Sequence, residues 1–117
     1  MKSYPFEHNT AWQECRLLIK LIHAHTASFA QAEGAFLAER INASAIDVSS
    51  NVIESISRKS SSGQRHYARG ATRTLMVVLN LILLAVDMGF ITQKDELTLR
   101  KQVEIVEDAL SVLMKSS

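Results

Sequence analysis

Apolar residues recur along this chain at steps of three and four, the spacing of one face of an α-helix. Four such segments predict helices over residues 10–28, 35–57 and 61–89, and from residue 92 onward. The core-facing stripe of the first segment is Trp12, Cys15, Ile19, Ile22 and Thr26, and that of the second is Leu37, Ile41, Ala45, Val48, Val52 and Ile56. The stripe of the last segment is Leu99, Val103, Val106, Leu110 and Leu113. Because short turns join the segments, we expect an all-α fold, an antiparallel up-down-up-down four-helix bundle.

The helix ends are predicted from residues that satisfy free backbone groups. Gly89 is placed to take the left-handed conformation after the third helix. Three pairs spaced three residues apart are typical of capping boxes at helix starts: Thr10 with Gln13, Ser61 with Gln64, and Thr92 with Asp95. We expect a single domain over residues 1–117, with an N-terminal arm at residues 1–9.

Residues 75–86 of the third segment are apolar on every side except at Asn80. Three partner helices of one bundle need less apolar surface than this, and large exposed apolar patches mark interfaces. The segment is well short of the roughly 20 residues that cross a bilayer. We therefore expect a homo-oligomer and no membrane association. Ile105 and Val112, seven residues apart, lie off the main stripe of the last segment and offer a second contact line.

Charge is unevenly distributed, although the formal net charge is only +1. No acidic residue lies between Glu54 and Asp87, whereas five arginines and lysines do, which leaves eight basic against twelve acidic residues elsewhere. The candidate nucleic-acid-binding residues in this basic region are Arg58, Lys59, Arg65, His66, Arg69 and Arg73. Arg65, Arg69 and Arg73 are four residues apart and would form one ridge on a helix. Each of them could contact one phosphate of RNA or DNA, and the binding would weaken steeply with salt.

Internal pairing is the alternative for these arginines. In an antiparallel bundle, the start of the third helix lies near Glu54 and near the end of the fourth helix. That end carries Glu104, Glu107 and Asp108 on one face. Exposed charges on such a face are usually solvated or paired with a basic neighbour.

No group of residues predicts catalysis, a metal site or a cofactor. His23 and His25 are two residues apart on a helix, so they point to different faces and cannot chelate one ion. Cys15 is the only cysteine, which excludes an internal disulfide and fits a reducing compartment. The N-terminus has no apolar run behind Lys2. We expect a cytoplasmic protein without enzymatic activity.

Several short motifs resemble those of the four-helix-bundle proteins encoded in intervening sequences of 23S ribosomal RNA genes. Trp12 and Gln13 match the opening of the family's first helix, and residues 48–55 resemble its central Ser-Ile-Pro-Ser-Asn-Ile-Ala-Glu-Gly run. The later matches are Tyr67, Ala71, Thr74, Leu75 and the Met-Gly-Phe-Ile close at residues 88–91. Asp47, Ser49, Ser55 and Val77 depart from the pattern, where the family has serine, proline, glycine and an acidic residue.

The resemblance implies a left-handed bundle that assembles into a ring-shaped homopentamer with no assigned enzymatic activity. It also implies a distant kinship with the accessory variability determinant proteins of diversity-generating retroelements, which bind nucleic acid and a reverse transcriptase through a basic surface. Two hypotheses follow for this chain. It is an oligomer that presents basic surfaces to RNA or DNA, or it is a protein-interaction scaffold whose arginines serve only subunit contacts.

Overall fold

In the computed structural model, which describes residues 1–115, the chain forms four long α-helices and two short 3-10 helices. The α-helices are α1 (Thr10–Thr26), α2 (Ala35–Ser57), α3 (Ser61–Asp87) and α4 (Gln93–Lys115), and the 3-10 helices are η1 (Pro5–His8) and η2 (Ala27–Phe29). No strand occurs in the described part of the chain. The predicted all-α class with four helices is confirmed.

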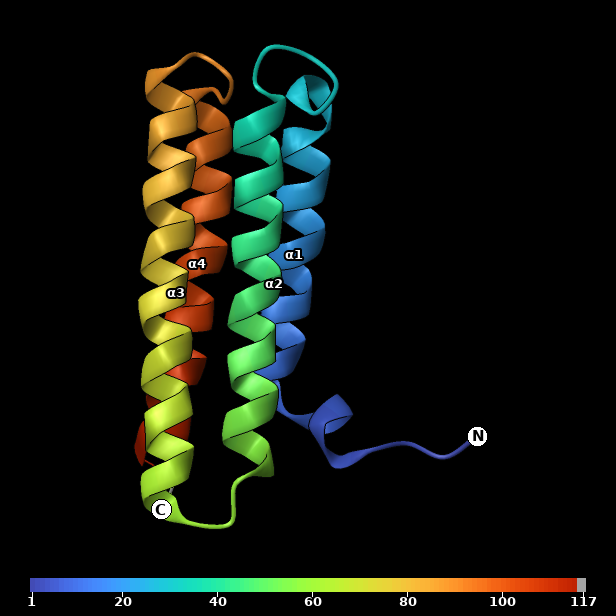
Figure 1. The fold of residues 1–117 in the computed structure, drawn as a ribbon, viewed down its shortest axis with the longest axis vertical. Helices are drawn as coiled ribbons and strands as arrows, with labels where there is room; N and C mark the ends of the chain where they lie inside the picture. Colours follow the sequence, from blue (N-terminus) through green and yellow to red (C-terminus); the bar gives the residue numbers. More distant parts are fainter. Residues whose placement is uncertain (116–117) are drawn as a thin grey trace.

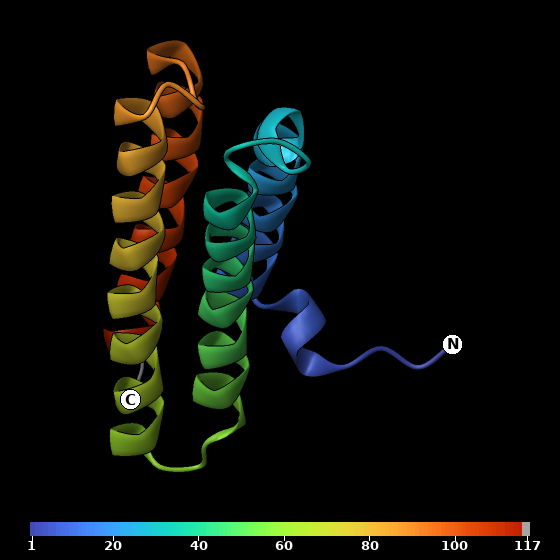
Figure 2. The same cartoon turned by 45° about the horizontal axis from the view of Figure 1, so that its top comes forward.

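The four α-helices lie side by side, as Figure 1 shows. α1 packs on α2 and α4, and α3 packs on the same two helices, which closes the arrangement. The α1–α2 and α3–α4 connections lie at one end of the molecule, where the rings of Phe29 and Phe90 stack with their centroids 5.2 Å apart. The α2–α3 loop lies at the other end, and the N-terminal arm projects away from the helices near that end (Figures 1 and 2).

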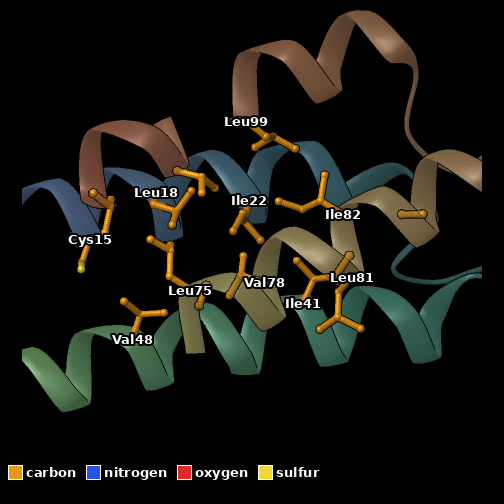
Figure 3. Packing of buried hydrophobic residues seen from close by; sticks show 14 of the residues in the cluster. Cys15, Leu18, Ile22, Ile41, Val48, Leu75, Val78, Leu81, Ile82 and Leu99 are labelled. Atoms are coloured by element: carbon orange, nitrogen blue, oxygen red, sulfur yellow. The ribbon is translucent and has the colours of Figure 1, made fainter. Parts of the chain in front are cut away.

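The core between the helices is built of aliphatic side chains (Figure 3). Leu18 and Ile22 of α1, Ile41 of α2, and Leu75 and Ile82 of α3 have no exposed surface. Burial of one such side chain contributes roughly 1.5–3 kcal/mol, so this core is what holds the helices together. The buried positions follow the three-and-four spacing from which the helices are predicted.

Small residues let α2 and α3 approach closely. Ala45 of α2 and Ala68 and Ala71 of α3 are all buried. A Cβ atom added at Gly70 would lie 3.2 Å from Oδ1 of Asn51, which is tighter than an ordinary contact. A side chain at position 70 would therefore push the Asn51 side chain of α2 aside by a few tenths of an ångström.

Two of the three predicted helix starts are wrong by one residue. The N-cap of α1 is Asn9 rather than Thr10, and its side-chain oxygen accepts a hydrogen bond of 3.2 Å from the backbone N–H of Trp12. The N-cap of α3 is Ser60 rather than Ser61. Asparagine ranks above threonine as an N-cap, which explains the first error, whereas two adjacent serines are equivalent in sequence.

The predicted glutamine partners also bond elsewhere. Gln13 donates to the carbonyl oxygen of Glu7, and Gln64 donates to that of Arg58, so each ties the preceding segment to its helix. At the third predicted start, the hydroxyl of Thr92 accepts a hydrogen bond of 3.1 Å from the backbone N–H of Asp95, which is the N-cap half of the predicted capping box. Side-chain amides reach several backbone groups near a helix start, and the sequence spacing alone does not select among them.

Gly89 ends α3 as predicted. Its φ of 82° lies in the left-handed region, which glycine adopts without the steric cost of a Cβ atom. The N–H of Gly89 donates to Val86, and the N–H of Phe90 donates to Ala85 at 2.9 Å. These two bonds form a Schellman motif, which satisfies the last carbonyl groups of the helix.

By length and composition, α3 is the one described helix that could cross a membrane. A core helix of a soluble protein meets the same two criteria. In this structure Leu75, Val78 and Ile82 of α3 are buried against the other helices. The helix also carries three arginines in its first half.

Candidate nucleic-acid interface

The α2–α3 connection, residues 58–60, is fixed by hydrogen bonds at both of its ends. The buried hydroxyl of Ser55 donates to the carbonyl oxygen of Gln64 at 2.7 Å, and the Gln64 side chain donates to the carbonyl oxygen of Arg58 at 2.9 Å. With the Ser60 cap, these bonds hold the first turn of α3 against the last turn of α2. The cations that follow are therefore carried on an ordered end of the molecule.

The predicted cationic residues extend from the α2–α3 loop to the middle of α3. Lys59 is exposed in the loop, and Arg69 and Arg73 are exposed on α3, while Arg65 is half-buried. Side chains four residues apart on a helix are neighbours, so the three arginines form one ridge over the first turns of α3. The exposed His66 lies on the same side, and its ring meets Tyr67 edge-on with the centroids 5.0 Å apart.

Internal pairing accounts for one of the six residues. Arg58 forms an ion pair with Glu54, one helical turn earlier, as the alternative interpretation predicts. Its guanidinium also lies over the ring of Tyr67, 4.5 Å from the ring centroid. The stacking on Tyr67 had no signal in the sequence, because the two residues come from different sides of a loop. Arg58 is thus engaged within its own chain.

The remaining cations have no acidic partner. Within residues 1–115, no ion pair involves Lys59, Arg65, Arg69 or Arg73. The predicted pairing of the arginines with the acids of α4 is therefore not formed in the described structure. Four cationic side chains of the candidate interface keep their charges available.

The acids that were expected to neutralise them lie exposed on α4. Glu104, Glu107 and Asp108 face solvent, and none of the ion pairs among the described residues includes them. Among the described residues, the arginines of α3 and these acids of α4 are thus exposed without being paired with one another.

The exposed side of α3 changes character along its length. Beyond Arg73 it carries the side chains of Met76, Val77, Leu84 and Met88, which are 40%, 45%, 37% and 54% exposed. We call these four residues the α3 apolar strip. The all-round apolar character of residues 75–86 thus divides into a face buried in the bundle and a face that the chain itself leaves uncovered.

Two titratable side chains outside this region, Cys15 and His25, have defined surroundings. Cys15 is buried, and burial, with a smaller effect of the neighbouring Glu14, raises the pKa of its thiol to about 12. Nδ1 of His25 donates a hydrogen bond of 2.8 Å to the carbonyl oxygen of Leu21, and Nε2 lies 3.8 Å from Oδ1 of Asp95 of α4. Among residues 1–115, no three His, Cys, Asp or Glu side chains are close enough together to hold a metal ion.

The comparison with protein families agrees with this architecture. The sequence profile of the family described as 23S rRNA-intervening sequence protein matches residues 7–112. The chain belongs to this family. The resemblance in the short motifs is thereby confirmed over nearly the whole chain. A comparison with curated proteins finds no match.

Two departures from the family motif have a structural role in this member. Ser49 stands where the 23S rRNA-intervening sequence proteins have proline, and its hydroxyl donates to the carbonyl oxygen of Ile46 within an unbroken α2. Ser55 stands in place of the glycine and makes the buried bond that joins α2 to α3. The hydroxyl of Ser49 thus bonds within α2, and that of Ser55 bonds across to α3.

Proposed function

We propose that this protein is a non-enzymatic, cytoplasmic oligomer of antiparallel four-helix bundles that presents its basic end to RNA or DNA. It acts without a metal or cofactor. A ring of five copies is the assembly that the family resemblance implies. The positions of the inter-helix turns support the antiparallel order, because successive connections lie at opposite ends of the molecule (Figure 1).

The observation that carries the nucleic-acid proposal is the set of unpaired cations at one ordered end. Lys59, Arg65 and Arg69 have no ion-pair partner in the described chain, and the exposed ring of His66 lies beside them. Arginine and lysine side chains that contact phosphates release condensed counterions, which gives binding a steep salt dependence. Positive charge in the first turns of α3 also opposes the helix dipole, and a bound phosphate would offset that cost.

Fluorescence anisotropy with a structured RNA at low salt tests this proposal. Replacement of Arg65 and Arg69 by alanine removes two ridge cations, and we expect binding to weaken and the salt slope to fall by about one for each lost phosphate contact. The control variant, Lys20→Ala with Lys94→Ala, removes the same charge from exposed positions elsewhere. The proposal is contradicted if the wild-type protein does not bind RNA, or if the Arg65/Arg69 variant and the control variant bind RNA with equal affinity.

A second candidate function is a protein-interaction scaffold whose arginines serve subunit contacts. The observation in its favour is the position of Arg73, which directly precedes the α3 apolar strip on the same exposed side. The scaffold predicts that Arg69→Ala with Arg73→Ala lowers the sedimenting mass while nucleic acid has no effect. The nucleic-acid function predicts lost RNA binding for the same double variant.

A further inference from the structure

The α3 apolar strip has a counterpart on the exposed side of α4. Leu97, Ile105 and Val112 of α4 are exposed by 67%, 40% and 67%, and Asp108 is exposed among them. On α3, Arg73 is followed by Val77 and Leu84. On α4, in the opposite chain direction, Asp108 is preceded by Ile105 and Leu97. Each face thus carries one charged residue followed by two apolar residues, and the charges of Arg73 and Asp108 are opposite. An exposed polar residue, Asn80 on α3 and Lys101 on α4, lies between the apolar residues of each face.

The matching residues also lie at matching heights along the bundle. α3 ends at Asp87 and α4 begins at Gln93, so Phe90 marks the middle of the turn between them. Arg73 lies 17 residues before Phe90 and Asp108 lies 18 after it. At a rise of about 1.5 Å per residue, their heights differ by about 1.5 Å.

The apolar residues agree in the same way. Val77 and Ile105 lie 13 and 15 residues from Phe90, and Leu84 and Leu97 lie six and seven residues from it. The corresponding differences in height are about 3 Å and about 1.5 Å. All three pairs are therefore in register along the helix axis.

We infer that the exposed side of α3 in one copy packs on the exposed side of α4 in a second copy. In this contact Arg73 pairs with Asp108, Val77 meets Ile105, and Leu84 meets Leu97. Rotation about an axis parallel to the helices shifts nothing along that axis, so residues of equal height on neighbouring copies meet. The contact is heterologous, as a closed ring requires. This inference rests on the proposal that the protein is an oligomer.

Charge disfavours the other ways of covering the α3 apolar strip. Two α3 strips related by an axis parallel to the helices would place Arg73 against Arg73. Two α3 strips related by a twofold axis perpendicular to the helices would run in opposite directions. The arginines of each copy would then lie on the apolar half of α3 in the other copy. The exposed charges of α1 on its outer face are Arg16 and Lys20, which repel the arginines. Among the described helices, α4 presents the largest group of unpaired acids.

The contact assigns different roles to the basic residues. Arg73 lies in the subunit contact beside the α3 apolar strip. Lys59, Arg65 and His66 lie nearer the α2–α3 loop and stay free at the basic end of each copy. Assembly therefore gathers several basic ends on one side of a ring, because all copies point in the same direction. Multivalent contact with a long nucleic acid would follow from that arrangement.

A charge exchange tests the central pair in the full-length protein. Sedimentation velocity over a concentration series gives the dissociation constant of the oligomer. We expect Arg73→Asp and Asp108→Arg each to raise it by about tenfold or more, because each places like charges together. The variant with both changes restores the pair in reverse and should return to within about threefold of the wild type. Lys20→Glu, a charge reversal outside the contact, should leave association unchanged.

An apolar substitution gives a second test that does not depend on charge. Leu97→Gln removes an apolar side chain of the contact that is 67% exposed and should also weaken association by about tenfold. Phe36→Gln is the matched control, since Phe36 is 58% exposed on α2 and lies outside the contact. Both positions are exposed, so circular dichroism should show the helix content of the wild type for each variant.

The outcomes separate this inference from the proposed function. A wild-type oligomer that is indifferent to both single charge reversals, or that the double variant fails to restore, overturns the α3–α4 contact and leaves the oligomer standing. A wild-type protein that is monomeric at every concentration overturns the contact and the proposed assembly together. The RNA-binding proposal is tested separately, by the affinity of the Arg65 and Arg69 variants for RNA, whatever the sedimentation results are.

Discussion

Asn9 is the residue that begins α1, and a stability measurement can verify this cap. Its side chain satisfies a backbone N–H of the first turn, which would otherwise lack a partner. We expect Asn9→Ala to lower the free energy of unfolding by about 1 kcal/mol. Thr10→Ala is the control and should change it by less than about 0.5 kcal/mol, because Thr10 is exposed and does not cap the helix. Urea denaturation distinguishes the two, and the reverse order of effects would contradict the assignment.

Cys15 is expected to be chemically inert while the protein is folded. The thiolate is the reactive species, and a pKa raised from 9.0 to about 12 lowers its population at pH 8 by about a thousandfold. A colourimetric thiol reagent should therefore label the folded protein at least about a hundredfold more slowly than the protein in urea. Labelling at equal rates in both states would show that Cys15 is exposed.

The same thiol contributes to the pH dependence of stability. Its pKa is higher in the folded state than in the unfolded chain, so the folded state prefers the neutral thiol. This contribution is fully present below about pH 9 and is lost as the pH rises towards about 12. Cys15→Ala should reduce the loss of stability over this alkaline range, as followed by thermal unfolding at a series of pH values.

At the scale of the element, α3 has two faces with different roles. Leu75 is fully buried, whereas Val77, two residues later, is 45% exposed. We expect Leu75→Ala to lower the free energy of unfolding by about 2–5 kcal/mol, because it leaves a cavity in the core. Val77→Ala should change it by less than about 0.5 kcal/mol in the monomer. Denaturant melts at low protein concentration would contradict this division if both variants were equally destabilised.

The elements themselves were largely predictable from the sequence. Long segments with a helical period have one stable arrangement for their apolar face, so α2 occupies residues 35–57 as predicted. Helix starts were less predictable, because Asn9 and Thr10, or Ser60 and Ser61, are neighbouring residues that can each cap a helix. Which of the two adjacent residues becomes the N-cap depends on the backbone conformation at the helix start, and residue spacing in the sequence does not determine that conformation.

The candidate site was predictable in its residues and less so in its pairing. The absence of acids between Glu54 and Asp87 marks the basic end directly in the sequence. Pairing with α4 was a fair alternative, because antiparallel neighbours bring Arg73 and Asp108 to similar heights. The faces of two adjacent helices diverge from each other, however, and residues at equal height need not meet. Leu97 was not singled out, because one exposed leucine is ordinary on a protein surface.

At the scale of the whole molecule, the chain combines a basic end with an otherwise acidic body. An assembly of parallel copies would gather the basic ends on one side and cover part of the apolar surface that α3 and α4 expose. Both consequences depend on self-association, which makes the number of chains in the particle the central claim. A monomer would leave the α3 apolar strip exposed to solvent and the four unpaired cations on a single small body.

Sedimentation equilibrium of the full-length protein at micromolar concentration and physiological salt measures that number directly. The account predicts a single species whose mass is a multiple of the 13.0 kDa chain, with five chains in the favoured ring. The species should persist on dilution until the dissociation constant is reached. A mass of 13.0 kDa at every concentration tested would contradict the account.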